Sequence, residues 1–412
     1  MPTLDKTAPK KPRESEEDQD EATTLTLSDL ATALAHAETR GTDAAVARQQ
    51  AIDFRKIIKR SLHQQKDEVL YDALARTESL DRLAGIHLKQ VIEDLAEVTV
   101  IERAEGKSME INAFVIPLFL HTTGGLDPER CFQDQEAFEL LRKSFQIGAL
   151  ESPAANVVLV NHGYHLNEID GITYSHLHEM LRDAFAAMTD KRIAATPAIN
   201  RSFGGWPDSP FAASDRAIEL RFLLGFSLKS VDDPFYAIPE DEVAADEWFA
   251  AREQRFQQWT AAVAPLVKRC FGVEETDGRI AGDSDVHFLY QDMFHGGKER
   301  GIAEYFMLQL ISELNHGLQK HGVEGQATRA TLGPVNLGEE QLLRVQLHAL
   351  ADGALVVQAD KPVPGQVDWD MEFSDANSAL TMIGVDVVSV AQRFDPAGTP
   401  LEISAYHEER LS

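Results

Sequence analysis

The sequence contains few cysteines and no long apolar run. Only two of its 412 residues are cysteine, Cys131 and Cys270, and neither belongs to a CxxC or Cys/His pattern. This scarcity excludes a disulfide-stapled scaffold and favours a reduced, cytoplasmic protein. The longest apolar run, residues 111–120, is far shorter than the roughly 20 residues of a membrane-spanning helix. Residues 1–24 contain no apolar signal segment, so we expect no secretory signal and no membrane insertion.

The sequence also lacks an excess of basic residues. Its 39 basic and 67 acidic side chains give a net charge of −28. Such acidity disfavours general binding to nucleic acids or anionic membranes, which attract basic surfaces. We therefore expect a protein partner or self-association.

Two charged segments stand out from this background. Arg55, Lys56, Lys59 and Arg60 form the basic cluster of the predicted N-terminal helices. They fit a solvated helix face, with partner or nucleic-acid contact as the alternative. Residues 232–253 carry eight carboxylates. They are typical of a solvated loop and helix start, with a docking face for a basic partner as the alternative.

Composition and periodicity divide the chain into four parts. Residues 1–24 have almost no apolar content and are predicted to be a disordered tail. Residues 25–106 repeat apolar side chains at three- and four-residue steps, which predicts a helical region. Residues 107–284 and 285–412 are predicted to be two α+β repeats. The first has an additional leading strand at 111–120, whose apolar run is typical of a strand covered on both faces, and a helix at 135–146.

The evidence for a repeat is self-similarity at an offset of 130 positions. Residues 160–165 align with residues 290–295, which places Tyr164 over Phe294 and His165 over His295. We expect each copy to run strand, loop, helix, strand, strand, helix. The predicted fold is therefore α+β, with a helical N-terminal region followed by two tandem ferredoxin-like (β-α-β-β-α-β) repeats related by pseudo-two-fold symmetry.

The predicted elements of each copy follow from the same alignment. In the first copy they are strand 156–160, loop 161–170, helix 173–188, strands 192–196 and 217–229, and helix 242–271. In the second they are strand 286–290, loop 291–300, helix 301–319, strands 326–331 and 341–358, helix 376–392 and a closing strand at 401–406.

Histidines supply the candidate acid–base or metal-binding groups. If the repeats pack about a dyad, His165 and His295 are expected to face one cleft as catalytic groups. The alternative is that each histidine caps the helix that follows it. His162 and His165, with Glu168 and Asp170, could ligate Zn²⁺ or Fe²⁺, but no HExxH-type spacing is present, and hydrogen-bonded loop histidines are the simpler interpretation. The sequence identifies no cofactor.

The loops offer candidate ligand-binding residues. Lys298 follows Gly296-Gly297, a possible anion nest without P-loop spacing. Arg201 and Trp206 lie in a glycine-containing segment that suits ligand contact, with an ordinary connection as the alternative. Tyr164 and Phe294 complete the predicted ligand set beside the two histidines.

The layout resembles an uncharacterised bacterial family, the domain of unknown function 2863. The resemblance spans residues 27–396 and depends on the helical N-terminus, the strand Phe114-Val-Ile-Pro-Leu118, the loop-to-helix segment 290–300 and Arg393-Phe-Asp-Pro396. Family members carry a cysteine pair after the Phe-Asp-Pro segment, whereas residues 397–406 contain none, which argues against a metal or redox role for this tail. The resemblance implies an architecture and no activity.

These observations support two hypotheses. The first is a non-enzymatic cytoplasmic binding or assembly module, since no nucleophile motif, Rossmann fingerprint or metal spacing is present. The second is an enzyme or small-ligand sensor with a histidine-containing cleft between the repeats.

Overall fold

The N-terminal unit of the computed structural model is a group of helices. The structure describes residues 16–102, 108–122, 134–146, 150–202, 217–270, 284–338, 340–363 and 368–406. Helices α1 (Glu16–Ala35), α2 (Ala44–His63), α3 (Asp67–Leu80) and α4 (Arg82–Glu97) pack against one another through apolar stripes. Asp43 and Asp81 cap the starts of α2 and α4 with their carboxylates. This unit confirms the predicted helical region.

Helix α1 begins inside the segment predicted to be a disordered tail, so the predicted boundary at residue 24 is wrong. Lys66, which precedes α3, forms ion pairs with Glu16 (3.2 Å) and Asp20 (2.6 Å) of α1. These contacts join segments far apart in sequence, and composition does not reveal them. Residues 1–15 lie outside the described residues.

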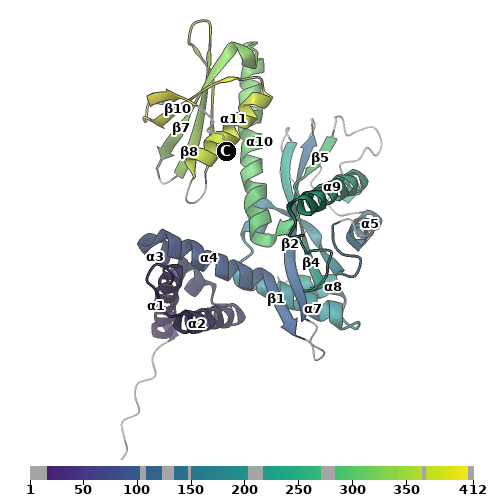
Figure 1. Ribbon diagram of the computed structural model, residues 1–412. Coiled ribbons are helices and arrows are strands. Elements are labelled where there is room, and N and C mark those ends of the chain that lie inside the picture. The colour runs from purple at the N-terminus through teal and green to yellow at the C-terminus, as the bar shows by residue number, and fades with distance from the viewer. Residues whose placement is uncertain are drawn as a thin grey trace, which may run out of the picture.

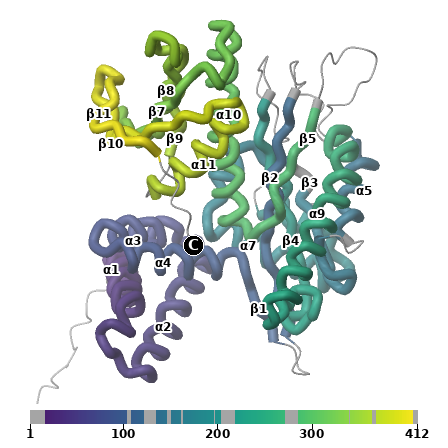
Figure 2. Tube along the Cα trace, turned by 45° about the horizontal axis from the view of Figure 1, so that its top comes forward, coloured from purple at the N-terminus to yellow at the C-terminus, as the bar shows by residue number. Residues whose placement is uncertain are grey.

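The first sheet is antiparallel and covered on both faces (Figures 1 and 2). Its path is β1 (Val98–Glu102), β2 (Ser108–Thr122), β4 (Ala217–Ser230) and β3 (Asn156–His165), and two short strands, β5 (Ser284–Phe288) and β6 (Asp292–Met293), also pair with β2. One face packs on α7 (Tyr174–Thr189) and the other on α5 (Gln135–Gln146) and α9 (Glu242–Cys270). The apolar run of β2 thus alternates between two cores, as its sequence predicts.

The second sheet contains a crossover. Its order is β11 (Pro400–Ala405), β10 (Val387–Phe394), β7 (Thr328–Leu337), β8 (Glu340–Ala349) and β9 (Leu355–Pro362). β10 runs parallel to β7, and α11 (Trp369–Met382) makes the connection between β9 and β10. One face of this sheet is covered by α11 and by the C-terminal half of α10 (Phe294–His321).

Helix α10 joins the two sheets (Figure 1). Near its start, Gly301 packs so closely on Phe222 and Pro117 that an added Cβ would lie 2.8 Å from each of them. Further along, Leu310, Leu314 and Leu318 belong to the core of the second sheet. A helix of 28 residues is about 42 Å long, which is enough to reach both cores.

The α+β class is confirmed, but two ferredoxin-like repeats are not. The predicted strand 286–290 overlaps β5, which pairs with β2 of the first sheet, so the predicted domain boundary after residue 284 falls inside that strand. The predicted strand 192–196 is wrong, because helix α8 occupies Ala195–Arg201. The two segments therefore do not have the same topology.

Three further predictions in the second half are wrong in their bounds. Helix α10 starts at Phe294, inside the predicted loop 291–300. The predicted strand 341–358 is the β8–β9 hairpin. The predicted helix 376–392 combines the end of α11 with β10. Gly384, at φ +80, follows that helix, and the β-branched residues after it favour a strand.

No helix in the described ranges combines the length and the apolarity needed to cross a bilayer.

Candidate functional site

His165 acts as a helix cap. It is the N-cap of the short helix α6 (Leu166–Asp170): its Nδ1 accepts the backbone N–H of Asn167 (3.3 Å), and its own backbone N–H donates to the Glu168 carboxylate (3.1 Å). The Nε2 atom lies 3.5 Å from Oε1 of Glu219 on β4. Burial and the nearby Arg221 guanidinium lower the pKa of His165, so the imidazole is neutral near pH 7. This arrangement is the capping alternative predicted for the histidine.

His295 lies in a buried junction between α4 and α10. Its side chain is 8% exposed, its Nδ1 is 3.9 Å from a Glu93 carboxylate oxygen, and its ring contacts Tyr174. The backbone N–H of His295 donates to Glu97 (2.9 Å). Burial lowers the pKa of His295 to about 3. His165 and His295 interact with different carboxylates, Glu219 and Glu93.

Burial also changes the pKa values of the two glutamates of this junction. It raises the pKa of Glu93 to about 7 and that of Glu97 to about 8, against a usual value of 4.5. Glu93 is 3.8 Å from Lys89. The junction therefore contains two carboxyl groups that hold protons near neutral pH, beside an imidazole that stays neutral.

Most of the other predicted ligand residues either form ion pairs within the protein or are buried. Lys298 pairs with Asp170 at 3.3 Å, so the two predicted loops do meet at this point. Arg201 lies at the end of α8 and pairs with Asp183 of α7 at 3.1 Å. Tyr164 and Phe294 are 1% and 0% exposed, which makes them core residues rather than ligand contacts. Trp206 lies outside the described residues.

Those metal candidates whose side chains the structure describes do not gather into a ligand set. Among the described residues, no group of three or more His, Cys, Asp or Glu side chains is arranged to hold a metal ion. His165 has the capping role given above, and the side chain of His162 lies outside the described residues.

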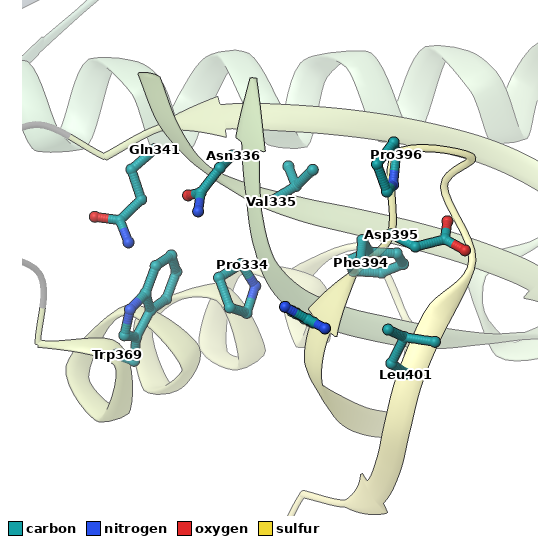
Figure 3. A pocket seen from close by; sticks show the side chains of 10 residues that line it. Pro334, Val335, Asn336, Gln341, Trp369, Phe394, Asp395, Pro396 and Leu401 are labelled. Carbon is teal, nitrogen blue, oxygen red and sulfur yellow. The ribbon is translucent and has the colours of Figure 1, made fainter. Parts of the chain in front are cut away.

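A pocket of about 410 Å³ opens at one end of the second sheet (Figure 3). Four elements build it: the end of β7, the start of β8, the first residue of α11, and the β10–β11 hairpin. Pro334, Val335, Phe394 and Leu401 give it apolar walls, and Trp369 lies to one side. The volume is within the range of small-molecule sites, and so is the mixture of apolar walls with a few polar groups.

Three polar side chains of this pocket, Arg393, Asn336 and Gln341, can donate hydrogen bonds and have no side-chain partner among the described residues. No carboxylate of the described residues lies within ion-pair distance of Arg393, whose side chain is exposed. The Asn336 and Gln341 amides, from the paired ends of β7 and β8, also make no side-chain hydrogen bond to described residues. These groups remain available to a ligand.

Asp395, which lines the same pocket, accepts hydrogen bonds from the protein backbone. Its carboxylate accepts the backbone N–H groups of Ala397 (2.9 Å) and Thr399 (2.8 Å) and so fixes the β10–β11 turn. Gly398 allows this turn by its φ of +83. The turn holds Arg393 opposite Leu401 in the hairpin register.

Sequence reasoning did not identify this pocket. In the sequence, Arg393 belongs only to the Arg-Phe-Asp-Pro segment, and Trp369, Asn336 and Gln341 lie in no recognisable motif. The local signal was the Asp395-Pro-Ala-Gly398 turn, which predicts a hairpin but not what the hairpin encloses.

Comparison of the chain with protein-family models, with curated proteins and with solved structures found no match in any of the three. The resemblance to the domain of unknown function 2863 therefore stays a prediction.

Proposed function

We propose that this protein is a non-enzymatic binding module and that the pocket of the second sheet takes a small organic carboxylate with a flat apolar part. The observation that carries the proposal is the Arg393 guanidinium, which has no carboxylate partner in the part of the chain that the structure describes and lies in a pocket of a chain with a net charge of −28. In a chain with so many carboxylates, an arginine without a carboxylate partner is available for an anion from outside.

The chemistry of the lining specifies the ligand class. Arg393 can donate two parallel hydrogen bonds to a carboxylate, and the amides of Asn336 and Gln341 can donate further ones. Trp369 and Pro334 offer flat apolar surface to the rest of the molecule. The turn fixes Asp395 through Oδ1, and the other lining groups are hydrogen-bond donors and apolar surface, so the lining suits holding a ligand.

The proposal is tested by calorimetric titration with benzoate, with uncharged benzamide as its isostere. We expect benzoate to bind and benzamide to bind at least about tenfold more weakly, because a hydrogen bond to a charged group contributes roughly 1.5–3 kcal/mol. Arg393→Gln should remove this preference. Arg329→Gln, an exposed arginine at the other end of β7, is the matched control and should preserve it.

The same titration separates this site from the histidine hypothesis. The pocket lining comes from the second sheet and α11, whereas His165 lies at the end of β3. His165→Ala should therefore leave benzoate binding unchanged. Benzoate binding that is lost in His165→Ala and kept in Arg393→Gln would overturn the proposal.

A further inference from the structure

The exposed face of α2 is basic. Arg48, Arg55 and Lys59 follow one another at seven- and four-residue steps, so they lie on the same side of the helix. Lys56 and Arg60 flank this line, and all five cations are exposed. None of them forms an ion pair with another described residue. Ile52, which is 51% exposed, lies among them.

The N-terminal half of α9 has the opposite character. Glu242, Asp246 and Glu253 are exposed and lie on one side of the helix with Phe249, which is 53% exposed. None of these acids pairs with a described cation. Phe249 and Glu253 also line a groove of about 750 Å³, together with Trp248, Tyr290, Arg252 and Arg300. The core contacts of α9 come from its second half, from Trp259 onward.

The two faces match residue by residue. On α2 the positions 48, 52, 55 and 59 are separated by four, three and four residues. On α9, read backwards, positions 253, 249, 246 and 242 have the same separations. If the helices lie antiparallel with Arg48 beside Glu253, the same register places Ile52 beside Phe249, Arg55 beside Asp246 and Lys59 beside Glu242. Arg60 then lies beside Asp241.

We propose that α2 of one copy docks antiparallel along the exposed Glu242–Glu253 face of α9 in a second copy. Within one molecule the faces lie apart: α2 belongs to the N-terminal helical unit and α9 covers the far side of the first sheet (Figures 1 and 2). The contact joins two different surfaces, so it is head-to-tail: one copy of a pair keeps its α9 face free, and the other keeps its α2 face free.

The features of both faces favour a second copy over a nucleic acid. A phosphate backbone offers no counterpart to Ile52, and the acidity of the whole chain repels it. The exposed face of α9 supplies an aromatic partner for Ile52 and a carboxylate for each of the three cations in line with it. Exposed ion pairs contribute little individually, so the association is weak, with a dissociation constant on the order of 0.1–1 mM, and salt-sensitive.

The experiment is sedimentation equilibrium of the full chain over a concentration series. The average mass should rise above the monomer value of 45.6 kDa at the highest concentrations in low salt. Raising NaCl from about 0.05 M to about 0.5 M should weaken the association at least about tenfold, because the charges become screened.

Paired charge reversals make the test specific. Arg48→Glu with Arg55→Glu reverses the α2 face, and Asp246→Arg with Glu253→Arg reverses the α9 face. Each variant alone should stay monomeric, and an equimolar mixture should associate again, because the reversed faces are complementary to each other. Recovery in the mixture also shows that both variants are folded. Lys191→Glu with Lys320→Glu, two exposed lysines on other elements, is the matched control and should associate like the wild type.

Three results would overturn the proposal. They are a wild-type chain that stays monomeric in low salt, an association that both reversed variants retain, and a mixture that fails to recover. A band shift of duplex DNA that Arg48→Glu with Arg55→Glu abolishes, without self-association of the wild type, would assign the α2 face to nucleic acid instead.

Discussion

Replacing Glu97 by glutamine is expected to stabilise the protein in alkaline solution and to leave it almost unchanged in acid. Glu97 is 6% exposed, and burial raises its pKa from the usual 4.5 to about 8. Between these two values the unfolded chain loses a proton that the folded chain keeps, so stability falls as the pH rises. Glutamine reproduces the neutral carboxyl group and can still accept the N–H of His295.

The effect is measured by urea unfolding at two pH values. At about pH 9 we expect Glu97→Gln to gain on the order of 2–4 kcal/mol of unfolding free energy over the wild type, and at about pH 4.5 almost none. Some pH dependence should remain, because Glu93 has a pKa of about 7 in the same junction. Glu299→Gln, a 56% exposed glutamate of α10, serves as the control and should show no such gain. A loss of stability at both pH values would mean that the folded protein holds Glu97 as a charged group.

Replacing Arg221 by methionine is expected to destabilise the protein strongly. Arg221 is completely buried in β4, with Nη2 3.1 Å from Oε1 of Glu219 and Nη1 donating to the Gly163 carbonyl at 3.2 Å. Methionine fills much of the same space without a charge, and Glu219 is then left buried without its main cation. Breaking a buried pair from one side costs about 3–5 kcal/mol.

A double variant separates the charge effect from packing. Arg221→Met with Glu219→Gln removes both charges, and we expect it to recover more than half of the unfolding free energy lost in Arg221→Met alone. Arg192→Met breaks a pair that is exposed on the arginine side (89%) and should cost under about 1 kcal/mol. If the double variant is less stable than Arg221→Met, Arg221 acts through packing or the Gly163 hydrogen bond, and the ion pair is not the cause.

Sequence patterns correctly predicted the elements whose secondary structure depends mainly on their own residues. The amphipathic helix at 135–146 has the predicted bounds, and the helix from 242 ends one residue earlier than predicted. The apolar run of β2 correctly indicated a strand covered on both faces. In these segments periodicity and burial agree over many residues, so local reasoning is sufficient.

Pairing between distant segments could not be predicted in the same way. The similarity of residues 160–165 to residues 290–295 suggested equivalent strands, yet the first stretch ends β3, which pairs with β4, and the second spans β6, which pairs with β2. Strand pairing depends on partners far away in sequence, and a short local match does not contain that information.

The candidate site was missed for a related reason. The predicted ligand residues Tyr164 and Phe294 lie beside histidines in sequence, but both are buried in the core, where large aromatic rings are most stable. The pocket of Arg393 is assembled from β7, β8, α11 and a hairpin, and no one of these segments carries a recognisable motif. What identifies it is an arginine without a carboxylate partner among the residues described, a property that only the folded chain reveals.

Helix α10 has a practical consequence for dissecting this protein. Its first turns complete the packing of one sheet and its last turns complete the other, without an interruption between them. No cut within the helix leaves both halves intact. A fragment that ends before residue 294 loses part of the core of the first sheet, and one that begins after residue 310 loses part of the core of the second sheet. Anyone expressing the halves separately would have to duplicate this helix in both.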